Sequence, residues 1–339
     1  MKGGLSPAQS GALITTKAKD VKILDEGVEN CAMDIVDKIS SGELELTKMF
    51  VKTEIHPQNC DDQGIDWVFF ADTLNFCFWM PETGPQYVVT YKGSTYTGYL
   101  AMCAAINRAL DQNIPLTDPK YFVNIDVDTL GRLLIGDEDV PIPLLEKRVE
   151  CLHETGKVLN NKFAGSFSQV LSLCDNSAPK LLELVLENFP CFNDSSEFEG
   201  ENVSFHKRAQ ILVADIWCLF EGTGRGGFEN IEQLTMFADY RVPQSLQHYQ
   251  VIKYSQELMD FLKEDKMLKS GDRWEQEIRG CSIEAVERVT RRVKEVLEVR
   301  GLKATVNSIL VDQFLWGYRR QHAEVMKSIP YHKVRSIYY

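Results

Sequence analysis

Apolar residues recur at helical spacing through most of the chain. Those between positions 28 and 39 fall on one helix face, and Ser6 followed by Pro7 is typical of a helix start. Beyond residue 140 helical patterns dominate, separated by glycine- or proline-containing breaks. The longer helices are predicted over residues 99–110, 146–162, 178–189, 207–220, 245–263, 283–300 and 308–326.

The segment from 66 to 99 has a different character. Its runs at 67–70, 74–79, 87–91 and 95–97 are rich in aromatic and β-prone residues, and the last two flank a tight turn at 92–94. This pattern predicts a small antiparallel sheet in the N-terminal third. The predicted fold class is therefore mainly α (α+β), a helical body that carries one small sheet. We expect a single compact unit over residues 1–339, with an N-terminal lobe over 1–130 and a helical lobe over 131–339.

The acidic net charge indicates which class of ligand the protein binds. Apolar residues make up 44% of the 339 positions, which is enough for a sizeable core. Acidic side chains outnumber basic ones 49 to 37, for a net charge of -12. Proteins that grip long nucleic acids usually neutralise phosphates with a basic surface. The composition therefore favours a small ligand, especially one that carries a positive group.

Cysteine and histidine positions show no metal or disulfide pattern. The nine cysteines include no C-x-x-C pair, and no H-E-x-x-H motif occurs. We expect reduced, mostly buried thiols, no structural or catalytic metal and no cofactor. The N-terminal residues lack the apolar core of a signal peptide, and no run approaches the roughly 20 apolar residues of a membrane span. We expect a soluble cytoplasmic protein, with nuclear or mitochondrial pools left open.

The stretch T-M-F-A-D-Y-R-V-P-Q at 235–244 places Asp239 between an apolar run and a predicted helix. An aspartate at such a junction can cap the helix. The same position can also hold a carboxylate rigidly for catalysis, so both interpretations stay open. Phe237 and Tyr240 offer aromatic surface to a heterocycle, and Arg241 offers a cation to a phosphate.

The stretch S-I-L-V-D-Q-F-L-W-G-Y at 308–318 sets Asp312 one helical turn before Trp316, with Tyr318 close behind. A carboxylate in such apolar company is costly unless it is paired or faces a ligand. A buried arginine partner would explain Asp312 as a structural residue. Otherwise Asp312 and Trp316 form a recognition pair for a flat ring rich in hydrogen-bond donors.

Two further stretches carry candidate binding residues. Lys207 and Arg208 stand at the start of a predicted helix, where free N–H groups and cations suit a phosphate. Solvated surface charge is the alternative interpretation. Asp72, in the D-T-L-N-F stretch of the predicted sheet, or Asn75 can turn inward toward a ligand, and a turn or strand-end role is equally consistent with the pattern.

A combination of stretches spans nearly the whole chain and is more specific than any one of them. They are D-T-L-N-F at 72–76, Y-K-G-S-T-Y-T-G-Y at 91–99, H-K-R-A-Q-I-L-V-A-D at 206–215, T-M-F-A-D-Y-R-V-P-Q at 235–244, E-I-R-G-C-S at 277–282, N-S-I-L-V-D at 307–312 and the terminal I-Y-Y. Together they resemble the queuosine salvage proteins, which are N-glycosidases of queuosine 5'-phosphate. One departure is Thr53, where relatives often carry a histidine; here His56 stands three positions later.

The resemblance implies a fold similar to the helix-hairpin-helix DNA glycosylases and the release of queuine from queuosine 5'-monophosphate. It assigns catalysis to Asp239, in the F-A-D-Y-R motif. Cleavage of the C1'–N bond builds positive charge on the ribose, as in glycoside hydrolysis. A fixed carboxylate can stabilise that charge or attack it covalently, and the choice between the two stays open.

The implied substrate also assigns provisional roles to the neighbouring residues. A 7-deazapurine has no N7 to protonate, so leaving-group activation must use its other polar edges. Asp312 is the first candidate for these contacts, with Phe237 and Trp316 stacking on the ring. Lys207 and Arg241 are the candidates for the 5'-phosphate.

Two other classes of function remain as alternatives. A glycosylase that excises a base from tRNA or DNA would share the chemistry, but the acidic balance disfavours it. A nucleobase-binding protein without catalysis would share the aromatic residues. We expect a monomer that acts on a small molecule, without stable binding to nucleic acid and without a membrane.

Overall fold

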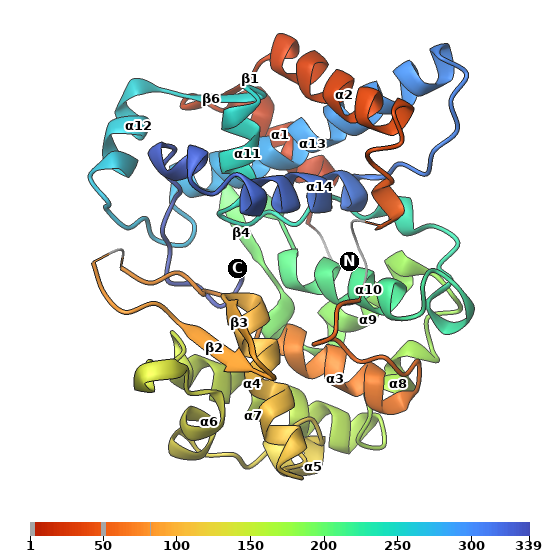
Figure 1. Ribbon diagram of the computed structural model, residues 1–339, viewed down its shortest axis with the longest axis vertical. Helices are drawn as coiled ribbons and strands as arrows, with labels where there is room; N and C mark the ends of the chain where they lie inside the picture. Colours follow the sequence, from red (N-terminus) through yellow and green to blue (C-terminus); the bar gives the residue numbers. More distant parts are fainter. Residues whose placement is uncertain (1–3, 49–51, 82) are drawn as a thin grey trace. The chain divides into compact units, whose positions relative to one another are not determined.

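The computed structural model describes residues 4–48, 52–81 and 83–339 (Figure 1). Helices dominate, as predicted, and the strands are short. The chain folds into two compact units, each assembled from segments that are distant in sequence. The first contains the described residues up to 48, Asp194–Lys207 and Glu232–Arg335; the second contains Lys52–Asn193, Arg208–Ile231 and Ser336–Tyr339. The lobe boundary expected at residue 130 falls inside the second unit.

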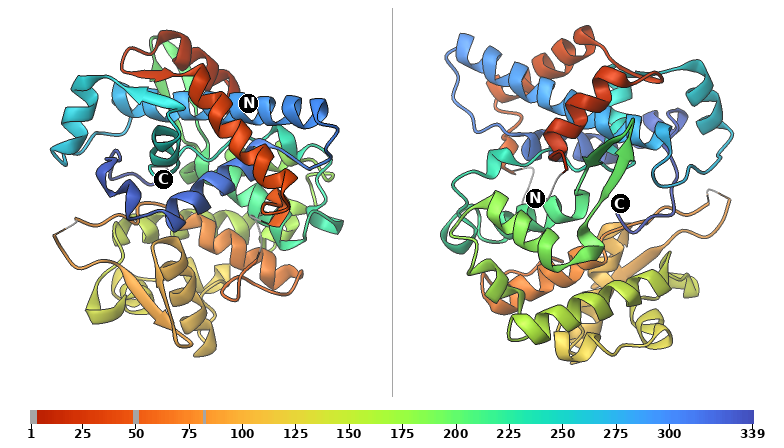
Figure 2. Two further views of the ribbon diagram at one scale, coloured as in Figure 1. Left: turned by 45° about the horizontal axis from the view of Figure 1, so that its top comes forward. Right: turned by 180° about the vertical axis from the view of Figure 1, so that it is seen from behind.

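The first unit is built around one long helix, α13. Its helices are α1 (Pro7–Lys17), α2 (Asp25–Ser40), α11 (Val242–His248), α12 (Gln256–Lys263), α13 (Arg273–Val299) and α14 (Ser308–Gln321). Helices α1, α2, α11 and α14 all pack against α13, and the right-hand view of Figure 2, from behind, shows α1 crossing it. The unit also contains the 3₁₀ turns Leu46–Lys48 and Val325–Ser328.

Ser6 starts α1 with a reciprocal capping box to Gln9, as the Ser-Pro pair predicted.

The crossing of α1 and α13 depends on small residues. A Cβ atom added to Gly280 would lie 2.6 Å from the Ile14 side chain, and one added to Gly11 would lie 3.0 Å from the Gly280 carbonyl. Glycine at both positions therefore allows the two helices to approach closely.

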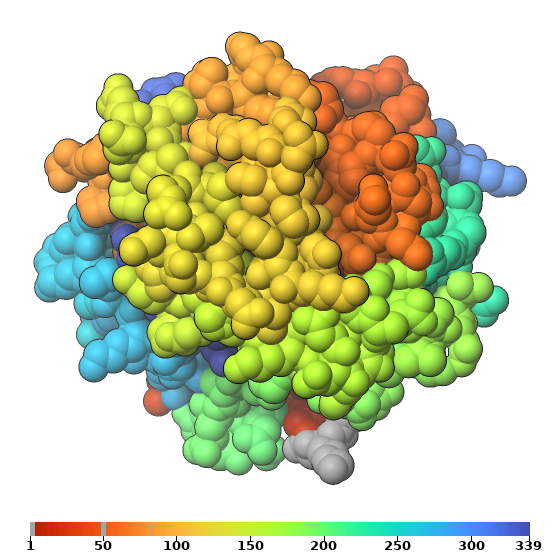
Figure 3. All heavy atoms as spheres, turned by 90° about the horizontal axis from the view of Figure 1, so that it is seen from below, coloured from red at the N-terminus to blue at the C-terminus, as the bar shows by residue number. Residues whose placement is uncertain are grey.

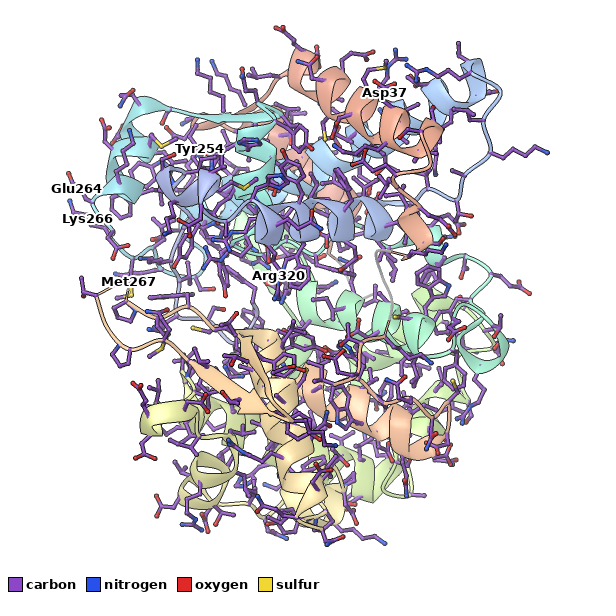
Figure 4. The ribbon with its side chains drawn as sticks, viewed as in Figure 1. Asp37, Tyr254, Glu264, Lys266, Met267 and Arg320 are labelled. Carbon is purple, nitrogen blue, oxygen red and sulfur yellow. The ribbon has the colours of Figure 1, made fainter. Side chains whose placement is uncertain are left out.

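This unit contains two strand pairs, of which the first joins distant segments and the second is a hairpin. Strand β1 (Val21–Ile23) pairs antiparallel with β6 (Ile252–Tyr254), and β4 (Ser195–Phe198) pairs with β5 (Glu201–Ser204). Strand β6 interrupts the single helix predicted over 245–263, so that prediction was wrong. Tyr254 turns into the body of the unit, whereas Glu264, Lys266 and Met267 extend from the loop after α12 (Figure 4).

The second unit is a group of helices with one hairpin. Its elements are α3 (Asp62–Thr73), β2 (Val88–Tyr91), β3 (Ser94–Thr97), α4 (Tyr99–Asp111), α5 (Pro119–Phe122), α6 (Val127–Leu134), α7 (Leu145–Lys162), α8 (Phe167–Leu171), α9 (Ala178–Asn188) and α10 (Lys207–Leu219), whose first residue belongs to the first unit. Short 3₁₀ turns cover Asp137–Asp139, Pro190–Phe192 and Gly224–Gly226, and a further one, Ile231–Gln233, has only its first residue in this unit. Helices α5 and α6 both pack against α7, and residues of this region, in yellow, form much of the face in Figure 3.

The predicted sheet over 66–99 is only partly present. The hairpin of β2 and β3 turns at Lys92 and Gly93, both with positive φ, as expected. The aromatic run at 67–70 instead lies in α3, and residues 74–79 form no strand. Burial explains the difference, because Trp67, Phe69 and Phe70 pack into the core of this unit on several sides of one helix.

Two buried arginines hold the D-T-L-N-F stretch in place. Arg148 donates hydrogen bonds to the carbonyls of Leu74 and Phe76, and Arg208 donates to that of Thr73. Arg208 is 1% exposed, so the interpretation of Lys207 and Arg208 as solvated charge was wrong. The stretch is thus explained by packing in the second unit. No described helix is long and apolar enough to cross a membrane.

Candidate active site

Asp239 lies at the junction predicted from the sequence. Residues 235–239 are irregular, and the buried side chains of Met236 and Ala238 anchor them ahead of α11. The Asp239 Oδ1 atom accepts hydrogen bonds from the N–H groups of Arg241 (2.8 Å) and Val242 (2.9 Å). Asp239 therefore caps the first turn of α11 with one oxygen, as one of the two interpretations expected.

The second oxygen of Asp239 is available for another role. Within the described part of the chain, no hydrogen bond reaches Oδ2, and the side chain is partly exposed. Burial raises the pKa of the Asp239 carboxyl above its ordinary value, while the charge of Lys207 and the two backbone hydrogen bonds act in the opposite direction. Asp239 thus combines a fixed orientation with an oxygen that a ligand can reach.

Asp312 connects α14 to the loop that carries Asp239. It is 2% exposed, and its Oδ1 accepts a hydrogen bond from the Phe237 N–H at 3.2 Å. Burial and then the negative charge of Asp239 raise the pKa of the Asp312 carboxyl well above its ordinary value. A raised pKa favours the protonated form of the carboxyl, in which it can donate a hydrogen bond. No arginine pairs with Asp312 among the described residues, so a buried arginine partner does not explain it, although the bond to Phe237 ties it to the loop.

Lys207 supplies positive charge to the same group. The Lys207 side chain is buried. The backbone N–H of Lys207 donates a hydrogen bond to the Asp194 carboxylate at 3.3 Å. The preceding His206 has a φ of 48°, a left-handed conformation that few residues of its size adopt. The Lys207 charge lowers the pKa of both Asp239 and Asp312, which places the lysine in electrostatic contact with both carboxylates.

A buried ion pair supports this group, and the sequence analysis did not identify it. The Arg279 guanidinium donates to the Ala238 carbonyl at 2.9 Å, to Asp194 at 3.0 Å and to Glu275 at 3.1 Å. It thereby holds the residue before Asp239 and the carboxylate that accepts the Lys207 N–H. The available signal was that Arg279 lies in line with Ile283 on the buried face of α13.

The four aromatic candidates differ in how much ring surface they offer to a ligand. Phe237 is only 3% exposed, so its ring has little surface for a ligand. Tyr240 packs against Tyr331, with 5.5 Å between the ring centroids. Trp316 is half-buried on the same face of α14 as Asp312. Tyr318 points to the opposite face, where it stacks on His322 at 4.0 Å.

Asp72 belongs to the second unit. It is fully buried in the last turn of α3, and its Oδ1 accepts a hydrogen bond from Asn75 at 3.1 Å. His56 lies in the same unit, where its ring accepts or shares hydrogen bonds with Thr53. Asp72, Asn75 and Arg208 thus lie in the second unit, whereas the candidates at 207, 237–241, 312, 316 and 318 belong to the first.

These groups define the class of site. An oriented aspartate, a second carboxyl held close to it and a buried lysine are suited to acid–base and electrostatic chemistry on a small polar ligand, and paired carboxyls are the groups that glycosidases use. No group of three or more metal-binding side chains occurs among the described residues. The protein is thus mainly helical and carries two neighbouring carboxyl groups, Asp239 and Asp312, beside a buried lysine.

Comparisons with known proteins identify the family. The family model described as queuosine salvage protein matches residues 55–339. A protein of Bos taurus named queuosine 5'-phosphate N-glycosylase/hydrolase is 46% identical over 341 residues, which cover 100% of both chains. Proteins of the same name from Mus musculus (44% identical, 99% of both chains) and Schizosaccharomyces pombe (36%, 98% of this chain and 99% of the relative) are also similar. The chain belongs to the queuosine salvage protein family.

Proposed function

We propose that the protein hydrolyses the N-glycosidic bond of queuosine 5'-monophosphate and releases queuine. Membership of the family and the names of its relatives support this substrate. The structural observation that supports the proposal most is the arrangement of the two carboxylate oxygens of Asp239. One of its oxygens is fixed by two backbone N–H groups, and the other is open beside a second carboxyl and a lysine.

The proposed reaction places Asp239 at C1' of the ribose. As the C1'–N bond breaks, its electron pair leaves with the base and the ribose becomes cationic. The ionised Oδ2 atom of Asp239 stabilises this cation, or bonds to C1' before water displaces it. In both courses one water is consumed: its hydroxyl group ends on C1' and its proton balances the base. The products are queuine and ribose 5-phosphate.

The leaving group needs a hydrogen-bond donor at an edge other than N7. Asp312 fits this role because its raised pKa favours the protonated form, which can donate a hydrogen bond. Trp316, one turn further along α14, presents a partly exposed ring for stacking. The cationic side arm of queuine suits a chain with a net charge of -12. We expect the protein to act as a cytoplasmic monomer without stable binding to nucleic acid.

A base-release assay separates this proposal from its alternatives. We expect the purified chain to liberate queuine from queuosine 5'-monophosphate, with chromatography as the readout, and to leave queuosine in intact tRNA untouched. Release from intact tRNA at a similar rate would indicate a polymer-acting glycosylase. Binding of queuine without release from any substrate would indicate a carrier protein.

Lys207 should control the acid limb of the pH–rate profile. We expect kcat/KM to fall by about tenfold per pH unit once Asp239 is protonated. This limb should lie above the range of an ordinary aspartate, because the pKa of Asp239 is raised. Lys207→Met removes a positive charge that lowers the pKa of Asp239. The acid limb of the pH–rate profile of this variant, measured on its residual activity, should therefore move to higher pH. Lys207→Arg, which keeps the charge, should leave the limb close to that of the wild type. An unchanged limb in Lys207→Met would refute the electrostatic role.

A further inference from the structure

Two arginines of the first unit share one acceptor near Asp239. The Gln244 Oε1 atom accepts a hydrogen bond from Arg241 Nη1 at 3.1 Å and another from Arg319 Nε at 3.2 Å. Gln244 is buried, and its amide nitrogen donates to the Ile329 carbonyl at 2.6 Å, which fixes the direction of the acceptor. A single glutamine thus holds two guanidinium groups within hydrogen-bonding distance of one oxygen.

Neither arginine forms a direct ion pair within the described part of the chain. The side chains of Arg241 and Arg319 are both partly buried. Burial, followed by the charge of Arg241, lowers the pKa of Arg319 to about 10. Two like charges that are held together and partly dehydrated weaken the fold, so a structural role alone does not explain them. An anion between them would relieve the repulsion.

The surroundings orient the pair and place it near the reaction centre. The Arg241 guanidinium stacks over the Tyr331 ring at 4.0 Å from its centroid, which leaves its edge for a ligand. Arg319 lies seven residues after Asp312, on the same face of α14. The charges of Asp239 and Arg241 both act on Arg319, which shows that the pair and the carboxylate are neighbours. Lys207 acts on both Asp239 and Asp312, whereas Arg241 acts on Asp239.

We propose that Arg241 and Arg319 form a clamp for the phosphomonoester of the nucleotide, with Gln244 holding the two guanidinium groups close together. This inference rests on the proposed function and assigns its phosphate subsite. Planar guanidinium groups bind phosphate oxygens through paired hydrogen bonds, whereas a lysine acts as a point charge. Lys207 then serves the carboxylates, and the clamp selects the nucleotide over the nucleoside.

The clamp can be tested by binding as well as by turnover. Titration calorimetry with ribose 5-phosphate should show binding to the wild type that weakens about tenfold to a hundredfold in Arg319→Met and in Arg241→Met. In Arg319→Met the KM for queuosine 5'-monophosphate should rise by a similar factor, with a smaller change in kcat. The melting temperature of Arg319→Met should equal or exceed that of the wild type, because a repulsion has been removed.

Matched variants separate the clamp from general charge effects. Arg300→Met removes an equal charge from an exposed pair with Asp37, labelled in Figure 4, and should leave phosphate binding unchanged. Arg319→Lys should recover only part of the affinity. Wild-type affinity for ribose 5-phosphate in Arg319→Met would overturn the clamp, as would a loss confined to Lys207→Met. A wild type that binds ribose 5-phosphate but releases no queuine would instead refute the proposed function and leave the clamp standing.

Discussion

Asp239→Asn is expected to lower kcat/KM for queuosine 5'-monophosphate by about a thousandfold or more, equivalent to about 4 kcal/mol of transition-state stabilisation. The asparagine side chain is neutral, so it cannot stabilise a cationic ribose as the carboxylate does. Its carbonyl can still accept the N–H groups of Arg241 and Val242, so the cap on α11 should survive. Steady-state kinetics together with a thermal unfolding curve would measure the two effects separately.

A second cap offers the matched control for this substitution. Asp126 caps α6 through the Thr129 N–H at 2.6 Å and lies in the second unit. Asp126→Asn makes the same chemical change at a helix start without touching the site, so its kcat/KM should stay close to that of the wild type. Near-normal turnover in Asp239→Asn would show that the carboxylate only caps the helix.

Loss of the Arg279 guanidinium should produce the largest change in stability. In Arg279→Met the buried carboxylates of Asp194 and Glu275 lose a cation that they share. Breaking a buried ion pair from one side costs about 3–5 kcal/mol of unfolding free energy. Arg279 also holds the Ala238 carbonyl, so kcat of any folded fraction should fall. Urea unfolding and turnover of the soluble protein would measure both.

Another arginine of α13 provides the comparison. Arg288 pairs with Glu284 at 2.8 Å in a partly exposed position on the same helix. Exposed pairs of this kind contribute about 0–1 kcal/mol, so Arg288→Met should have little effect on unfolding or turnover. Equal effects of the two substitutions would contradict the role assigned to Arg279. Arg279→Lys, which keeps a charge but not the three-way geometry, should restore stability more than kcat.

The helical part of the fold was predictable because its periodicity is local. Helix α7 was predicted over 146–162 and is observed over Leu145–Lys162. The aromatic run at 67–70 was misassigned, because its composition suits a half-buried strand equally well and only tertiary burial selects a helix. The division into two interleaved units depends on which distant segments meet, which single-sequence patterns do not contain. The likeness to helix-hairpin-helix DNA glycosylases stays a prediction.

The candidate site was partly predictable for the same reason. Asp239, Asp312 and Lys207 were recognised as polar groups in apolar or helix-start contexts, and the structure brings them into one electrostatic group. Arg279 and Arg319 were missed because their roles depend on partners elsewhere in the chain. In the sequence each resembles an ordinary charged residue of an amphipathic helix.

The position of the ribose relative to Asp239 tests the central claim most directly. A crystal structure of Asp239→Asn with intact queuosine 5'-monophosphate would reveal it. We predict that the side-chain atom at the Oδ2 position lies about 3–3.5 Å from C1', on the face opposite the base. A nucleotide bound with C1' remote from residue 239, or a side chain turned away from the sugar, would contradict it.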